Sequence, residues 1–362
     1  MIPWSPLPDA PDFPASGFAQ LADRIADLLG TRNDVVLVQA EAVVALEAAA
    51  SSLGRPGLVA LNVVTSLYGA WFGGWLRHAG ATVIDLTAEP GRPITAQVVA
   101  EALETHDIGL LAMVHAESAT GILNPLPEIM ALAQKAGVMT VVDAVASFGG
   151  HPVPVDALGI DVAVIGPQKT MGGQAGCSAI SISPRAWDVM NPAGEAPSIL
   201  SLADLKAGWI DAGRGALPGT PSPIEFHALA ATLDRIEAEG LTAMLTRHGV
   251  AAQAMRAGVA ALGVMPWVAP EHASNLVTAG PVPEGYSADD LTRALPQGAT
   301  MIAPGVGPAG ERLVRLNHTG PRACPAVVLS ELAAYAGALA RLGETVDCGA
   351  GLAAAASVFE GA

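Results

Sequence analysis

Charged residues are scarce in this chain of 362 residues, since only 14% are Asp, Glu, Lys or Arg. Basic residues are the rarest, with 18 Lys and Arg against 34 Asp and Glu, so the formal net charge is -16. Nucleic acids and anionic membranes are bound by clustered positive charge, and this composition argues against both as partners. Only three lysines are present, Lys135, Lys169 and Lys206, so each is a candidate for individual scrutiny.

Long hydrophobic runs and a secretory signal are also missing. Hydrophobic residues make up 51% of the chain, but many are alanine, and no uninterrupted run of about 18 apolar residues could span a bilayer. The first residues, MIPWSPLPDAPDFPASG, contain no basic segment followed by an apolar one. The sequence therefore predicts a cytoplasmic protein.

Cysteine is limited to Cys177, Cys324 and Cys348, which are widely spaced and form no CxxC pair. This pattern predicts neither a metal site nor a redox dithiol, and reduced structural thiols are the expected state.

Apolar strand-like runs alternate with helical periods from residue 34 onward, a pattern typical of a mostly parallel sheet flanked by helices. We expect an α/β fold with a large, doubly wound domain of seven strands. The predicted strands are Val35–Val38, Leu58–Asn62, Thr82–Leu86, Gly109–His115, Val138–Asp143, Asp161–Gly166 and Ser178–Ser183.

The length exceeds what one hydrophobic core usually organises, so two domains are expected. We predict an N-terminal arm over residues 1–17, a large domain over 18–240 that carries the binding site, and a small α+β domain over 241–362. A helix over Phe18–Leu29 would open the large domain. In the small domain we expect helices near Asp289 and Pro325, and short strands at Trp267–Val268, Leu276–Thr278, Thr300–Ala303 and Leu313–Asn317.

The densest chemical signal lies between residues 141 and 187. One predicted strand ends at Asp143, and another is followed by Gln168 and Lys169 and then by a glycine turn. Ligands of open α/β sheets gather at the carboxyl ends of strands, so both side chains would face one crevice. A lysine there can condense with a pyridine aldehyde, and a carboxylate can keep the ring nitrogen protonated. Taken singly, Lys169 would more often be a solvated surface lysine, and Asp143 a loop cap or a salt-bridge partner.

The segments VVDAVASFGG and GPQKTMGGQAG resemble the class V aminotransferases of fold type I. The resemblance extends over most of the chain. It includes HAESATGILNPLPEI, GTPSPIEF and VRLNHTG, which begin at residues 115, 219 and 314. This resemblance implies a transaminase fold with a large and a small domain, B6 chemistry, and a homodimer or homotetramer.

The resemblance also assigns roles to individual residues. Lys169 matches the family's Schiff-base lysine, Asp143 the partner of the pyridine nitrogen, and Gln168 the residue beside the lysine. In the same way, Ser118 matches a hydroxyl that contacts the ring substituents, and Tyr68 an aromatic stacked on the ring. Without the resemblance, Tyr68 could equally be a core aromatic.

Arg315 matches the arginine that binds the substrate carboxylate, for which a planar, two-pronged donor has the right shape. A second carboxylate-binding arginine stands nine positions earlier in some relatives, where this chain has Val306. The identity of the oxo acid is therefore less well defined by the sequence than the identity of the vitamer.

The phosphate-binding turn of the family is altered in this chain. Where most relatives have a Gly-Ser-Gly-Thr-like run at a helix start, this chain has Gln39-Ala40-Glu41-Ala42-Val43. A carboxylate within about 4 Å of a phosphate would repel it by roughly 4 kcal/mol per pair of unit charges. Glu41 can instead accept a hydrogen bond from the neutral 5'-hydroxymethyl of an unphosphorylated vitamer. Thr220, which relatives use on the phosphate from a neighbouring subunit, is retained.

This pattern is similar to that of the pyridoxamine–pyruvate aminotransferase branch, in which pyridoxamine is a substrate. The sequence thus predicts amino transfer from free pyridoxamine to a small 2-oxo acid, with pyruvate expected, giving pyridoxal and L-alanine in vitamin B6 degradation. No tightly bound cofactor and no metal are expected. Two alternatives stay open: a conventional pyridoxal-phosphate enzyme of the alanine/serine–glyoxylate type, and a catalytically silent B6-binding homologue.

Overall fold

The computed structural model describes residues 11–362, except 193, 298, 300–301 and 308–309. A seven-stranded sheet forms the large domain, with the strand order β1-β7-β6-β5-β4-β2-β3. Only β7 runs antiparallel to its neighbours, so the carboxyl ends of the other six strands meet at one edge. This confirms the predicted α/β class. The strands are β1 (Asp34–Val38), β2 (Val59–Val64), β3 (Thr82–Thr87), β4 (Leu110–Val114), β5 (Met139–Asp143), β6 (Val162–Ile165) and β7 (Ser178–Ile182).

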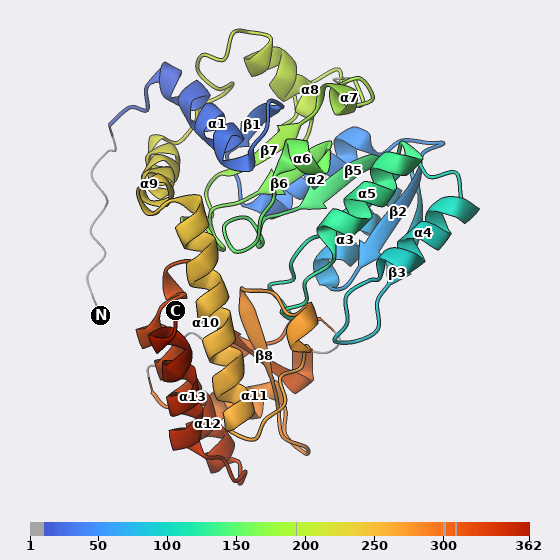
Figure 1. The fold of residues 1–362 in the computed structure, drawn as a ribbon. Helices are drawn as coiled ribbons and strands as arrows, with labels where there is room; N and C mark the ends of the chain where they lie inside the picture. The colour runs from blue at the N-terminus through green and yellow to red at the C-terminus, as the bar shows by residue number, and fades with distance from the viewer. Residues whose placement is uncertain (1–10, 193, 298, 300–301, 308–309) are drawn as a thin grey trace.

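Helices cover both faces of this sheet (Figure 1). One hydrophobic core contains residues of α1 (Ala15–Leu29), α4 (Ala96–Thr105), α5 (Leu126–Ala136), α6 (Val155–Leu158) and α9 (Pro223–Glu239). A second core, on the other face, contains residues of α2 (Ala42–Leu53), α3 (Leu67–His78), α7 (Pro184–Trp187) and α8 (Leu202–Leu205). A single π turn at Lys206–Ile210 extends α8. All strands except the edge strand β3 are largely buried, which is why they read as continuous apolar runs in the sequence.

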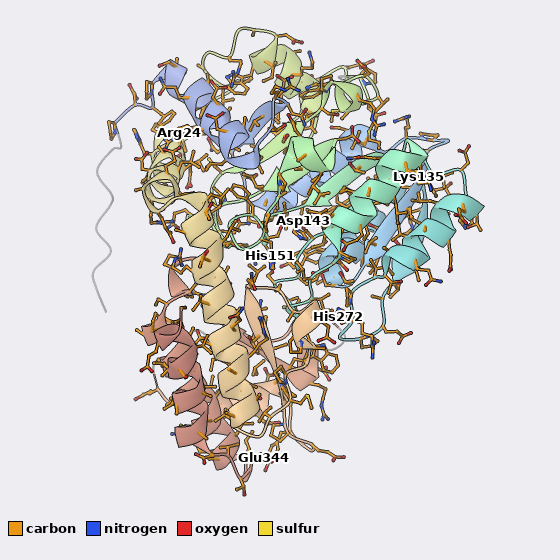
Figure 2. All side chains as sticks on the ribbon, viewed as in Figure 1. Arg24, Lys135, Asp143, His151, His272 and Glu344 are labelled. Atoms are coloured by element: carbon orange, nitrogen blue, oxygen red, sulfur yellow. The ribbon has the colours of Figure 1, made fainter. Side chains whose placement is uncertain are left out.

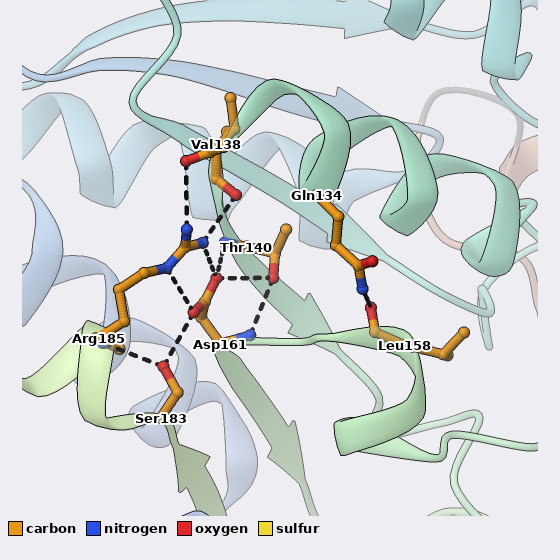
Figure 3. A network of polar contacts seen from close by, with 9 residues as sticks. Gln134, Val138, Thr140, Leu158, Asp161, Ser183 and Arg185 are labelled. Carbon is orange, nitrogen blue, oxygen red and sulfur yellow. Dashed lines mark hydrogen bonds and ion pairs between the residues drawn. The ribbon is translucent and has the colours of Figure 1, made fainter.

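A buried carboxylate anchors the amino end of β6 (Figure 3). Asp161 accepts hydrogen bonds from the Thr140 backbone amide at 2.9 Å and the Ser183 hydroxyl at 3.0 Å. Arg185 pairs with it through Nε at 3.0 Å and a terminal nitrogen at 2.6 Å. This network joins β5, β6 and α7 at the edge of the sheet where the parallel strands begin.

The small domain follows Gly240, a glycine with φ of 83° that separates α9 from α10 (Leu241–Ala261). Its antiparallel sheet has the order β8-β10-β9, with β8 at Val277–Pro281, β9 at Ala303–Pro304 and β10 at Leu313–Asn317. The remaining helices are α11 (Ala288–Ala294), α12 (Pro325–Arg341) and α13 (Cys348–Glu360), with 3-10 turns at Pro270–His272, Gly310–Arg312 and Gly320–Arg322.

One small-domain prediction was wrong, and one helix was not predicted. Trp267–Val268 forms no strand: the Trp267 amide donates to the Ala279 carbonyl, but Pro266 has no N–H to continue a ladder. The helix α13 was not predicted, because its Ala- and Gly-rich sequence has little polar periodicity. It is held by packing on α10 and α12. Residues 300–301 of the strand predicted at Thr300–Ala303 lie outside the described residues, as do residues 1–10 of the predicted arm.

Candidate active site

The carboxyl ends of five strands carry polar side chains into one region of the molecule. Five of the predicted residues line a single cavity of about 360 Å³. Figure 2 shows Asp143, one of them, in the middle of the molecule, where the large domain meets the small one. The five residues are Glu41, Tyr68, Ser118, Asp143 and Lys169.

Lys169 stands on a tight turn that follows β6. The turn is closed by backbone hydrogen bonds from Gly172 to Lys169 at 2.9 Å and from Gly173 to Pro167 at 2.7 Å. The buried hydroxyl of Thr170 donates to the Ala146 carbonyl, which joins this turn to the segment after β5. Burial lowers the pKa of the Lys169 ammonium, and the nearby positive charge of Arg315 lowers it further. Glu41 and Asp143 act in the opposite direction, and the net effect is a Lys169 pKa below that of an exposed lysine.

Asp143 is the last residue of β5. Its Oδ1 accepts the Val145 amide at 2.9 Å, and among the described residues no group donates to Oδ2. Burial raises the pKa of this carboxyl to about 6, against the opposing effect of Lys169. A cationic ring nitrogen placed against Oδ2 would restore the charged form that burial disfavours.

Glu41 caps the N-terminus of α2. Its Oε2 accepts the Val43 amide at 2.9 Å, and its Oε1 accepts Nε2 of Gln168 at 2.5 Å. The Gln168 side chain reaches Glu41 across Gly166, where an added Cβ would lie 2.4 Å from Gln168 Oε1. Gln168 therefore contacts Glu41 and does not line the cavity. The Val43 amide, which an anion at this helix start would need, is already occupied.

Tyr68 lies in the first turn of α3, which the Ser66 hydroxyl caps by accepting the Tyr68 amide at 3.3 Å. Burial raises the pKa of the Tyr68 phenol, while Arg315 and Glu41 act on it with opposite signs. The ring packs edge-on against Trp71, with centroids 5.6 Å apart. Tyr68 thus forms an aromatic wall beside the carboxylates of the cavity.

Arg315 reaches the site from β10 of the small domain. Its Nε donates to the Pro304 carbonyl at 3.0 Å, whereas its terminal nitrogens have no hydrogen bond or ion pair within the described part of the chain. Its influence on the pKa values of Lys169 and Tyr68 places it close to both. The guanidinium is free to bind a carboxylate through two parallel hydrogen bonds.

Thr220 is not brought to this cavity. It lies in the loop before α9 and lines a separate hollow of about 720 Å³ with Val38, Leu217 and Ile199. Val306 stands in the loop between β9 and β10. The structure therefore unites the other predicted residues around Lys169 and leaves Thr220 apart from them within one copy of the chain.

Glu117 is a cavity residue that was not predicted from the sequence. This carboxylate follows β4, is fully buried and lines the cavity beside Ser118. It accepts the Thr65 hydroxyl at 2.6 Å and also the Ser66 hydroxyl, both from the turn between β2 and α3. The signal was available, because an acidic residue just after a buried strand is the same pattern that singled out Asp143.

Among the described residues, no cluster of three or more His, Cys, Asp or Glu side chains could hold a metal ion. None of their helices is both long enough and apolar enough to cross a membrane.

Comparison with known proteins places this chain in a family. The model of the class V aminotransferases matches residues 15–319. A pyridoxamine–pyruvate transaminase of Mesorhizobium japonicum is 33% identical over 348 residues, which cover 95% of this chain and 88% of the relative. An alanine–glyoxylate aminotransferase of Callithrix jacchus is 30% identical, covering 83% and 74%.

Solved structures agree. The pyridoxamine–pyruvate aminotransferase of Mesorhizobium loti superposes with a TM-score of 0.89 at 32% identity and covers 96% of this chain and 89% of that one. The ureidoglycine–glyoxylate aminotransferase of Bacillus subtilis, at 23% identity and a TM-score of 0.87, shares the fold. On these grounds, the chain belongs to the class V aminotransferase family.

Proposed function

We propose that the protein is a transaminase that transfers the amino group of free pyridoxamine to a small 2-oxo acid. Pyruvate is the expected acceptor, and pyridoxal and L-alanine are the products. The observation that carries the proposal is the position of Glu41, whose carboxylate occupies the Val43 amide at the start of α2. The activity of the Mesorhizobium relatives supports the same substrates.

The residues present fit an unphosphorylated B6 ring better than a phosphorylated one. A phosphate at the start of α2 would have to displace Glu41 from Val43 and lie beside a carboxylate. A neutral hydroxymethyl group, by contrast, can donate a hydrogen bond to Glu41, which is itself held by Gln168. The vitamer is thus expected to enter and leave as a reactant, with no tightly bound cofactor.

The side chains of the cavity divide the work of amino transfer among them. The bound ring supplies an electron sink conjugated to the reacting carbon. Asp143 holds the proton on the ring nitrogen, and Lys169 Nζ, with its lowered pKa, carries a proton between the reacting carbon atoms. Tyr68 covers the ring and excludes water, and Ser118 contacts the ring substituents.

The acceptor side of the site is built around Arg315. Its two free terminal nitrogens can bind the carboxylate of the oxo acid from the small-domain side of Lys169. Val306 offers no second positive charge, so one guanidinium would carry this interaction, and the choice of pyruvate rests on the activity of the Mesorhizobium relatives.

A conventional pyridoxal-phosphate enzyme is the competing function, as in the alanine–glyoxylate relatives. It would need a different set of groups to hold the phosphate. Glu41 and the separation of Thr220 from the cavity both count against it within one copy of the chain.

The proposal includes a homodimer or homotetramer in the cytoplasm, acting in vitamin B6 degradation. Ile199 is 72% exposed and borders the hollow that contains Thr220, a suitable surface for a second copy. Light scattering on the purified protein tests this part, and a monomer at micromolar concentration would contradict it.

The activity is tested by following pyridoxal formation from pyridoxamine and pyruvate with purified protein. We expect turnover without added pyridoxal phosphate, and loss by a factor on the order of 10³ in Lys169→Ala. Lys135→Ala is the matched control, because Lys135 lies in the last turn of α5 and does not line the cavity. A tightly held phosphate-bearing chromophore in the purified protein, together with no turnover of pyridoxamine, would refute the proposal.

A further inference from the structure

Two loops that hold the ring-binding residues are joined by one buried carboxylate. Glu117 is 0% exposed and extends from the loop after β4, one residue before Ser118. Its two oxygens accept the hydroxyls of Thr65 and Ser66, which belong to the turn before α3. The Ser66 hydroxyl in turn accepts the Tyr68 amide. A continuous hydrogen-bond chain therefore runs from the Ser118 loop to the first turn of the Tyr68 helix.

The second branch of this network is equally fixed. The Thr65 hydroxyl accepts Nδ2 of Asn124 at 2.9 Å, and Nδ2 also donates to the Val114 carbonyl at 2.8 Å. Each of the two hydroxyls accepts one hydrogen bond and has one proton to donate, which the structure directs to Glu117. An ionised Glu117 accepts at both oxygens, whereas a glutamine amide at this position would accept at only one.

We propose that Glu117 is a positioning residue of the vitamer site, holding the turn that carries Tyr68 against the loop that carries Ser118. Glu117 does not take part in proton transfer; it fixes the width of the slot in which the ring lies. This inference rests on the proposed function, since it assumes that a B6 vitamer occupies the cavity.

The ionisation of Glu117 gives the arrangement a pH dependence. Burial, and to a smaller extent the charge of Asp143 at the end of β5, raise the pKa of this carboxyl to about 7 against the opposing hydrogen bonds from Ser66 and Thr65. Tyr68 on α3 is the other titratable group that interacts with it electrostatically, and Glu41 and Lys169 line the same cavity. His115 stays neutral, because burial lowers its pKa to about 3. As the pH rises through 7, Glu117 becomes the double acceptor that the network needs, and the slot becomes more rigid.

The test compares Glu117→Gln with the wild-type protein. We expect the variant to have a KM for pyridoxamine about tenfold higher at pH 8, corresponding to the loss of one hydrogen bond in the network, with a smaller change in kcat. The titration of pyridoxamine itself cancels in the ratio of the two KM values, and this ratio should increase from pH 6 to pH 8. A ratio near one, or a ratio that does not change with pH, overturns the inference.

A second measurement needs no vitamer. In the free protein, amide hydrogen exchange over residues 65–72 should be faster in Glu117→Gln, because the Tyr68 amide loses the fixed Ser66 hydroxyl. Unchanged exchange there contradicts the positioning role. If wild-type protein binds neither pyridoxal nor pyridoxamine, the proposed function fails instead, and the exchange result still decides the role of Glu117 in the free site.

Asp161→Asn is the matched control. It also removes a buried carboxylate from the sheet, but at the opposite edge, where Asp161 binds Arg185 and Thr140. We expect lower stability with an unchanged KM ratio and unchanged exchange over residues 65–72. Should Glu117→Gln not fold, Thr65→Val removes one donor to Glu117 and leaves the charge in place. It should raise the KM for pyridoxamine, and a wild-type KM in Thr65→Val overturns the inference.

Discussion

Replacing Glu41 should change which B6 vitamer the protein binds. In the structure, Glu41 accepts hydrogen bonds from two donors that an anion would otherwise use. These are the backbone amide of Val43 at 2.9 Å and the side-chain amide of Gln168 at 2.5 Å. Glu41→Ser frees the Gln168 amide and most of the helix start, while serine remains a good N-cap for α2. Glu41→Gln keeps the length of the side chain and removes only its charge.

The magnitude follows from the charges. A phosphate at this helix start would lie about 4 Å from the carboxylate, and each pair of unit charges would repel by about 4 kcal/mol at an effective dielectric of about 20. Removing that repulsion corresponds to about a thousandfold gain in affinity for pyridoxal phosphate. Pyridoxal should bind Glu41→Ser about tenfold to a hundredfold more weakly, because a charge-assisted hydrogen bond to its hydroxymethyl is lost.

Absorbance titrations with pyridoxal and with pyridoxal phosphate, at one fixed salt concentration, measure both affinities. Glu41→Gln separates the two effects: it should gain affinity for the phosphate and retain much of its affinity for pyridoxal. The reasoning is refuted if Glu41→Ser and Glu41→Gln bind pyridoxal phosphate no better than the wild type, or if Glu41→Ser binds pyridoxal as well as the wild type does.

Three further predictions follow from the same geometry. Arg315→Lys should raise the KM for pyruvate about tenfold to a hundredfold with little change in kcat, because the two-pronged donor is lost; a wild-type KM would contradict this. Burial raises the pKa of Asp143 from 3.8 to about 6. The free energy of unfolding of the vitamer-free protein should therefore fall by up to about 3 kcal/mol as the pH rises from about 4 through 6. Asp143→Asn should remove that loss in urea denaturation at pH 4 and pH 7, and the same loss in both proteins would exclude Asp143 as its source. Asp161→Asn should lower the free energy of unfolding by about 1–3 kcal/mol, since Arg185 is half exposed, and should leave pyridoxal affinity unchanged.

The sequence alone determined the sheet and the centre of the site. Six of the seven strands are largely buried and appear as continuous apolar runs, and the predicted bounds of all seven agree with the structure to within two residues. Asp143 and Lys169 follow two of these runs, and parallel strands bring such positions to one edge. The same pattern also contained Glu117, but its importance depends on hydroxyls 51 and 52 residues away in the chain.

Only the tertiary structure decided how Glu41 and its neighbours are used. The sequence showed a carboxylate at a helix start, whereas the structure shows it closing on its own helix and bound to Gln168 across Gly166. Likewise, the small-domain helix α13 is stabilised by packing on α10 and α12, which no local pattern reveals. Local periodicity follows from neighbours in the chain, but hydrogen-bond partners 50 or more residues apart are chosen by the fold. For that reason the sequence predicts that Glu41 selects the vitamer, and the structure adds the contacts of Glu41 with Val43 and Gln168.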